Sequence, residues 1–131
     1  MSALAAELIA LNQKLLDSIF TGDWKTYAAL CADDVTCFEP EGQGHLIEGL
    51  AFHKFYFDLP AGPAGVPPKV SMAGPVVKPL GADAALVLYT RLVQVNTPNG
   101  PVTKRTEETR VWQKTNGTWK LAHLHRSPPG A

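Results

Sequence analysis

The sequence lacks an excess of charge of either sign, because 12 Lys and Arg residues balance 12 Asp and Glu residues among its 131 positions. Proteins that bind nucleic acid by neutralising phosphates usually carry a clear basic excess. Charged residues make up only 18% of the chain and hydrophobic residues 45%, which is enough apolar material for one core. We therefore expect one domain over residues 1–131 and no nucleic-acid partner.

Cysteines and long apolar segments are also scarce. Cys31 and Cys37 are the two thiols and lack a CxxC spacing, so a disulfide framework is not expected. The first residues do not form a positively charged leader, and the longest apolar stretch, residues 84–89, has only the length of a strand. We expect a cytoplasmic protein without a membrane partner.

Motifs for phosphate binding and for covalent catalysis are missing as well. Gly42 and Gly44 are followed by His45 where a dinucleotide-binding loop needs a third glycine, and the chain contains no Walker loop. No G-x-S-x-G elbow is present to expose a nucleophilic serine. We therefore expect neither a cofactor nor a catalytic residue.

The first half of the chain has helical periodicity. Apolar residues recur at steps of three and four from Leu4 to Ile19, which predicts a helix that Ser2 caps. Asp23 is placed to cap a second short helix that ends near residues 33–34. Residues 35–38 have strand character, and residues 50–57 have a helix-like pattern.

The second half has the pattern of strands. Four prolines and two glycines predict a loop over residues 60–68, and four β-type runs follow at residues 69–78, 84–95, 102–114 and 118–127. Asn-Gly pairs at 99–100 and 116–117 favour hairpin turns, because these residues tolerate positive φ angles. We expect an α+β domain in which a curved antiparallel sheet wraps around the long N-terminal helix.

Three of the four arginines, Arg91, Arg110 and Arg126, lie inside the predicted strands. Alternation places Arg91 on the face of Tyr89 and Val87, and Arg126 on the face of Leu124 and Ala122. It places Arg110 on the face of Glu108 and Trp112. A guanidinium on an apolar face needs an anion, or it costs several kcal/mol of desolvation. The anion is either internal or a small external carboxylate held by two hydrogen bonds. The internal candidates are Glu39, Glu41, Glu107 and Glu108.

Histidines offer a weaker signal. His123 and His125 share a face of the last strand and could chelate a metal, but no third ligand has a fixed spacing, so core or pocket histidines are expected instead of a metal site. His53 lies among aromatic residues of the third helix. It is either a hydrogen-bonded core residue or a wall of the arginine pocket.

Several segments resemble the association, or hub, domain of calcium/calmodulin-dependent protein kinase II. They are residues 22–27 (GDWKTY), 38–41 (FEPE), 48–57 (EGLAFHKFYF), 107–112 (EETRVW) and 123–127 (HLHRS). The resemblance covers nearly the entire chain. It implies the cone-shaped fold that this family shares with nuclear transport factor 2 and ketosteroid isomerase.

The resemblance also implies a function. Such domains form homo-oligomers, two stacked rings of roughly a dozen or more subunits, which concentrate the attached kinase domains. It implies an arginine-lined pocket able to accept a small carboxylate, with Arg91, Arg110, Arg126, His53, Glu39 and Tyr89 as the candidate ligand-binding residues. Lys54 replaces an arginine of the family signature, and the proline-rich loop replaces a loop that contains Trp. The abundance of Ala, Gly and Pro suggests a non-animal relative, algal or bacterial.

Two other functions remain open at this point. One is a small-molecule enzyme of the isomerase or cyclase type, with Glu39 or His53 as the general base and the arginines stabilising an enolate-like anion. Three arginines would lower the pKa of a nearby carboxyl, which argues against that base. The other is a stand-alone carboxylate sensor whose assembly responds to its ligand.

Overall fold

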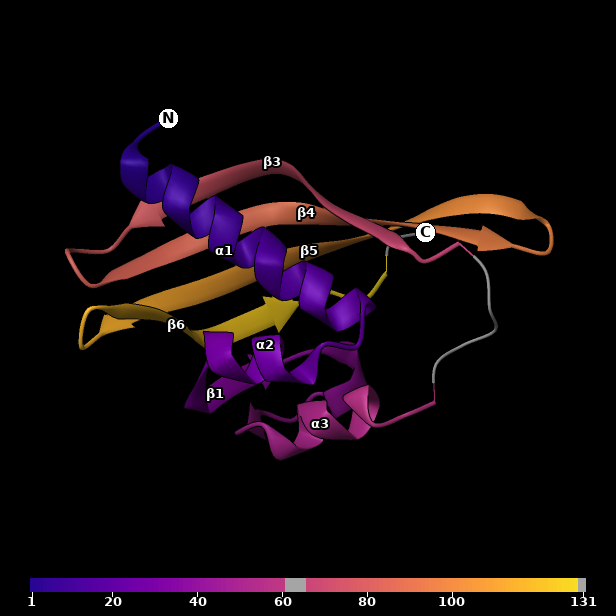
Figure 1. Ribbon diagram of the computed structural model, residues 1–131, viewed down its shortest axis with the longest axis horizontal. Helices are drawn as coiled ribbons and strands as arrows, with labels where there is room; N and C mark the ends of the chain where they lie inside the picture. Colours follow the sequence, from indigo (N-terminus) through magenta and orange to yellow (C-terminus); the bar gives the residue numbers. More distant parts are fainter. Residues whose placement is uncertain (61–65, 130–131) are drawn as a thin grey trace.

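The computed structural model describes residues 1–60 and 66–129, in which helices precede most of a six-stranded sheet (Figure 1). The helices are α1 (Ala3–Phe20), α2 (Trp24–Leu30) and α3 (Ala51–Phe57), with a 3-10 turn, η1, at Pro40–Gly42. The strands are β1 (Cys31–Phe38), β2 (Ile47–Glu48), β3 (Lys69–Pro79), β4 (Ala84–Thr97), β5 (Gly100–Thr115) and β6 (Thr118–Arg126). This order confirms the predicted α+β class.

The helix caps are those that the sequence predicts. The Ser2 hydroxyl accepts a hydrogen bond from the Ala5 amide at 3.1 Å, and the Asp23 carboxylate accepts one from the Thr26 amide at 3.1 Å. Each cap satisfies an amide that has no partner within its helix. The predicted end of α2 is wrong, because Cys31 already adopts an extended conformation and pairs with Leu121 of β6.

The sheet has the strand order β2-β1-β6-β5-β4-β3. The four consecutive strands β3 to β6 form the predicted antiparallel meander, and Asn116 and Gly117 make the β5–β6 turn with φ angles of 51° and 78°. The parallel pairing of β1 with β6 was not predicted. Of the predicted loop at 60–68, residues 61–65 lie outside the described part of the chain.

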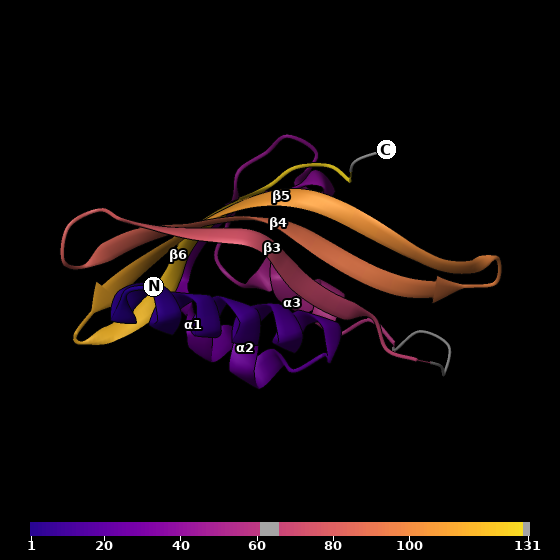
Figure 2. The ribbon, with the colours of Figure 1, turned by 90° about the horizontal axis from the view of Figure 1, so that it is seen from above.

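The helices cover the concave face of the sheet, which curves over them in Figure 2. Leu8, Leu15 and Leu16 of α1 are fully buried and belong to the same core as Val87 and Trp112 of the sheet. This arrangement confirms the prediction of a curved sheet wrapped around the first helix.

A polar contact fixes α1 against the sheet. The indole of Trp112 donates a hydrogen bond to the amide oxygen of Asn12 at 3.0 Å, and the Asn12 amide nitrogen donates to the Met72 sulfur at 3.2 Å. Asn12 and Trp112 are both completely buried, so each would lose about 1–3 kcal/mol if it were left without its partner. The helix therefore has one favoured position along β3 and β5.

None of the helices α1, α2 and α3 covers the convex face of the sheet (Figure 2). Rows of paired residues across the strands bring together Val76, Leu86, Leu88, Val111 and Phe38 on this face. Val76 and Phe38 are exposed and the other three are half-buried.

Residues 1–60 and 66–129 include no helix with the length and hydrophobicity that crossing a bilayer requires.

Candidate functional site

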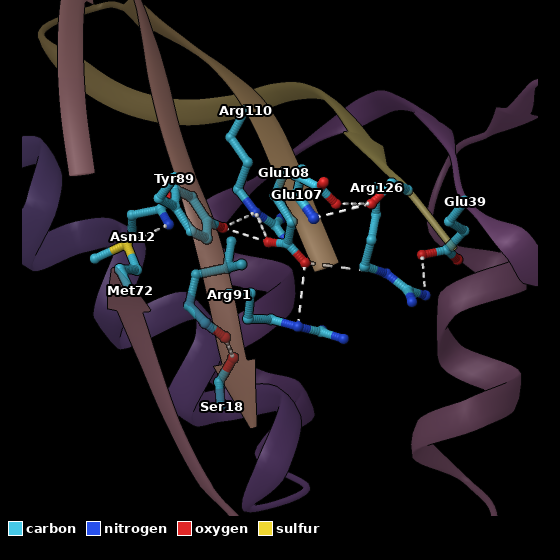
Figure 3. A network of polar contacts seen from close by, with 12 residues as sticks. Asn12, Ser18, Glu39, Met72, Tyr89, Arg91, Glu107, Glu108, Arg110 and Arg126 are labelled. Carbon is cyan, nitrogen blue, oxygen red and sulfur yellow. Dashed lines mark hydrogen bonds and ion pairs between the residues drawn. The ribbon is translucent and has the colours of Figure 1, made fainter. Parts of the chain in front are cut away.

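The register of three strands brings the predicted arginines to one concave face. Tyr89 of β4 lies opposite Glu108 of β5, which lies opposite Arg126 of β6. Two residues further along each strand, Val87 lies opposite Arg110. These side chains therefore gather beneath the curve of the sheet, as Figure 3 shows.

A β-bulge changes one detail of the predicted pattern. The β5–β6 register shifts so that Trp112 lies opposite Leu121 while Val111 lies opposite His123, which leaves Ala122 as the extra residue. Leu121 is consequently fully buried, whereas Ala122 is half-buried. The expectation that Ala122 shares the inward face of Arg126 fails because simple alternation does not continue through a bulge.

Glu108 is the central anion of the cluster. Its Oε1 accepts hydrogen bonds from Nε and Nη2 of Arg110 at 3.2 and 3.1 Å, and another from the Tyr89 hydroxyl. Its Oε2 lies 3.4 Å from Nε of Arg91 and 4.0 Å from Nε of Arg126. Glu108 therefore contacts all three arginines, which makes it the main internal counter-ion among the four glutamates considered.

The protonation states of this cluster follow from burial and from the neighbouring charges. Burial alone would raise the pKa of Glu108, but the charges of Arg110 and Arg91 hold that pKa below its ordinary value. Burial also opposes the charge of Arg110, yet Tyr89 and Glu108 keep the pKa of Arg110 well above its usual value. Burial lowers the pKa of Arg91, which Glu108 offsets only in part. It raises the pKa of Tyr89 to about 12, so the phenol stays neutral.

Arg126 connects the sheet to the segment around η1. Its Nη2 donates to the carboxylates of Glu41 at 2.5 Å and of Glu39 at 3.3 Å. Burial alone would raise the pKa of Glu41, but the hydrogen bond and the charge of Arg126 lower that pKa below its ordinary value. Glu39 directly follows β1 and Glu41 lies in η1, so the position of both depends on the parallel pairing of β1 with β6.

A cavity of about 190 Å³ opens beside this charged cluster. It is lined by Ile19, Tyr27, Glu39, Glu41, His53, Tyr56, Phe57, Arg91, Arg110, Leu124 and Arg126. One wall is therefore charged and formed mainly by the sheet, while the other is aromatic and formed by α2 and α3. Such a mixture of an apolar surface and a few convergent polar groups is typical of small-molecule sites.

His53 lies on the aromatic wall. Its Nδ1 is 3.1 Å from the Tyr27 hydroxyl, and the side chain is buried among Tyr27 and Phe52. Burial lowers the pKa of His53, and the nearby charge of Arg110 lowers it further, against an opposing effect of Glu39. At neutral pH the imidazole is consequently uncharged.

Several buried polar atoms of the cluster have no hydrogen-bond partner among the described residues. They are Nη1 of Arg110, Nε of Arg91, Oε2 of Glu108 and Nε2 of His53. An unpaired buried polar group costs about 1–3 kcal/mol. A ligand that supplies partners to these atoms would recover that free energy.

The structure brings together five of the six candidate residues around the cavity: Arg91, Arg110, Arg126, His53 and Glu39. Tyr89 does not line the cavity. Its hydroxyl instead accepts a hydrogen bond from Nε of Arg110 at 2.9 Å. Glu107 takes no part, because it faces the opposite side of β5 and accepts from the Ser127 hydroxyl. Tyr27 also lines the cavity, and nothing in its helical spacing indicates this position.

His123 and His125 do not line the cavity, so the expectation of core or pocket histidines was wrong for them. Both project from the opposite face of β6, where His123 Nδ1 lies 2.7 Å from the Thr36 hydroxyl and His125 is exposed. Within residues 1–60 and 66–129, no three His, Cys, Asp or Glu side chains are grouped to hold a metal ion.

Comparison with known proteins gives the family. The family model for the calcium/calmodulin dependent protein kinase II association domain matches residues 4–130. The Caenorhabditis elegans calcium/calmodulin-dependent protein kinase type II is 43% identical over 128 residues, which are 97% of this chain and 17% of that protein. The rabbit delta subunit is 38% identical over 97% of this chain and 24% of its own length. The chain thus spans about a fifth of the length of these curated relatives.

Solved structures agree with this match. The hub homology domain of Chlamydomonas reinhardtii superposes with a TM-score of 0.87 and 48% identity over 97% of this chain and 98% of that one, consistent with the suggested non-animal relative. The C. elegans association domain superposes with a TM-score of 0.86 and 42% identity over 96% of both chains. A nuclear transport factor 2-like protein of Pseudomonas putida, 18% identical, shares the fold with a TM-score of 0.75 over 100% of this chain and 91% of its own. The chain therefore belongs to the association domain family of calcium/calmodulin-dependent protein kinase II.

Proposed function

We propose that this domain is a homo-oligomerisation hub that assembles into a two-layered ring and scaffolds attached kinase domains. The observation that carries the proposal is the family match, which extends over residues 4–130. Its solved relatives are themselves hub or association domains, at 42–48% identity. A ring of roughly a dozen or more subunits needs at least two different contact surfaces on each copy, because stacking and closure use different symmetry operations.

The convex face of the sheet supports self-association. Val76, Leu88 and Phe38 lie on this face in one row of paired residues that also contains Thr109 and His125, and no helix of the described part of the chain covers them. Exposed apolar patches on soluble domains commonly mark interfaces between proteins. We assign this face to contact with a second copy of the chain.

The cavity is proposed to accept a small carboxylate. Arg91 and Arg110 are two fixed guanidinium groups with unpaired buried nitrogens, and a planar carboxylate is the anion that guanidinium groups bind with two parallel hydrogen bonds. The domain itself is proposed to be non-catalytic. The isomerase or cyclase alternative would use Glu39 or His53 as its general base. The carboxylate of Glu39 is paired with Arg126 at 3.3 Å and Nδ1 of His53 lies 3.1 Å from the Tyr27 hydroxyl, which favours structural roles for both.

Native mass spectrometry of the purified chain at micromolar concentration tests the assembly. The expected result is a single large homo-oligomer, and a monomer or simple dimer would overturn the ring. The same measurement with and without added pentanoate separates the scaffold from the carboxylate sensor. A scaffold keeps its mass, whereas a sensor changes mass with the acid.

A further inference from the structure

The charges around the cavity are balanced, although the arginines are its most prominent feature. Three guanidinium groups, those of Arg91, Arg110 and Arg126, are contacted by the three carboxylates of Glu39, Glu41 and Glu108. A ligand that carries only negative charge would be attracted by the arginines and repelled by the glutamates. The balanced charges of the site therefore do not by themselves favour an anionic ligand.

The two signs are not evenly mixed across the cavity. Arg110 is only 2% exposed and its Nη1 has no acceptor among the described residues, while Oε1 of Glu108 occupies its Nε and Nη2. Arg91 Nε is also without a hydrogen bond, at 3.4 Å from Glu108 Oε2. Both arginines line the cavity from β4 and β5, and this is the side where a ligand carboxylate can be bound.

The available negative charge lies on the other side. Arg126 makes its shorter contact, 2.5 Å, with Glu41 and only a longer one, 3.3 Å, with Glu39. The side chain of Glu39 is 12% exposed, and it lines the cavity together with His53 and Tyr27 of the aromatic wall. A carboxylate with one long ion pair beside aromatic rings is a favourable place for an ammonium group, since both the charge and the ring faces attract cations.

From this separation we infer that the cavity binds a small zwitterion, with its carboxylate on Arg91 and Arg110 and its ammonium group on Glu39. The inference rests on the proposed carboxylate-accepting cavity and adds the second charge of the ligand. A volume of about 190 Å³ corresponds to about six water molecules of liquid, which limits the ligand to a short ω-amino acid.

Isothermal titration calorimetry of the assembled protein with three probes of matched length tests the inference. The probes are 5-aminopentanoate, which carries both charges, pentanoate, which carries only the carboxylate, and pentylamine, which carries only the ammonium group. We expect 5-aminopentanoate to bind at least about tenfold more tightly than either of the others, because each of those probes lacks one of the two charged groups that the cavity would bind. Equal affinities for 5-aminopentanoate and pentanoate would overturn the zwitterion and leave the carboxylate site intact.

The variant Glu39→Gln removes one charge while keeping the shape of the side chain. It should abolish the advantage of 5-aminopentanoate over pentanoate, measured as the ratio of the two dissociation constants for the same variant. Glu48→Gln is the matched control, because Glu48 is an exposed carboxylate that does not line the cavity. An advantage that persists in Glu39→Gln would overturn the assignment of the ammonium group to Glu39. Binding of neither carboxylate probe by the unaltered protein would overturn the proposed cavity function together with this inference.

Discussion

Glu108 and Arg110 lie two residues apart on β5, and the carboxylate of one accepts two hydrogen bonds from the guanidinium of the other at 3.1 and 3.2 Å. Both residues are 2% exposed. Residues i and i+2 of a strand share a face, so this pair forms within one strand and points into the domain. Glu108 therefore supplies a fixed negative charge among the three arginines, which without it would attract an external anion to this position.

The first prediction concerns this counter-ion. Glu108→Gln leaves Arg110 and Arg91 buried without their anion and should lower the free energy of unfolding by about 3–5 kcal/mol. Urea unfolding at one fixed protomer concentration measures the change, because assembly contributes to the apparent stability. The neighbouring Glu107→Gln is the control and should have a much smaller effect, since Glu107 is exposed. Equal losses in the two variants would contradict the central role of Glu108.

The second prediction concerns ligand binding. Arg91→Met removes one guanidinium from the cavity and should weaken pentanoate binding by about 1.5–3 kcal/mol, the usual value of a hydrogen bond to a charged group. Calorimetry measures the loss. Arg105→Met is the control, because Arg105 is exposed and does not line the cavity. Unchanged binding by Arg91→Met would mean that this arginine serves only to neutralise Glu108.

The third prediction concerns pH. Burial lowers the pKa of His53 below its ordinary value of 6.5, so between the two values the unfolded chain binds a proton that the folded chain does not. The free energy of unfolding should therefore fall as the pH drops below about 6.5. Urea unfolding at about pH 7.5 and about pH 5.5 measures the fall, which should become smaller in His53→Gln. His45→Gln should not alter it, because His45 is exposed. A fall that is the same in all three proteins would exclude His53 as its source.

The fourth prediction concerns assembly. Leu88→Asp places a charge on the convex face of the sheet and should reduce the mass of the oligomer, since an unpaired charge is not tolerated in an apolar interface. Light scattering measures the mass, and circular dichroism checks that the fold is kept. Thr103→Asp adds the same charge at an exposed position of the β4–β5 hairpin and should leave the mass unchanged. An unaltered mass for Leu88→Asp would place the interface elsewhere.

Local features of the fold were predictable because they depend on neighbouring residues. The capping by Ser2 and Asp23, the period of α1 and the turn at Asn116-Gly117 all arise from interactions within a few positions. The end of α2 was not predictable in this way. Residues 31–34 join a strand because Cys31 pairs with Leu121, and a residue ninety positions away leaves no local pattern.

The site was predictable in its residue types but not in its pairing. Alternation placed Arg91 and Arg110 on inward faces, and the structure brings them to one cavity. The choice of Glu108 over Glu107 as the counter-ion could have followed from alternation as well, since Glu108 shares the face of Arg110. The contact between Glu39 and Arg126 could not, because it depends on the β1–β6 pairing.

That pairing has a consequence for the order of folding. The strand that carries Glu39 and Glu41 to the cavity is held by the last strand of the chain, so the sheet cannot be completed until residues 118–126 are available. Contacts between segments so distant in sequence raise the contact order and slow folding. During synthesis the helices and the β3–β5 meander can form first, whereas the cavity and the complete convex face arise only after β6 has been made. Self-association through this face, as proposed above, therefore requires that β6 has already been made.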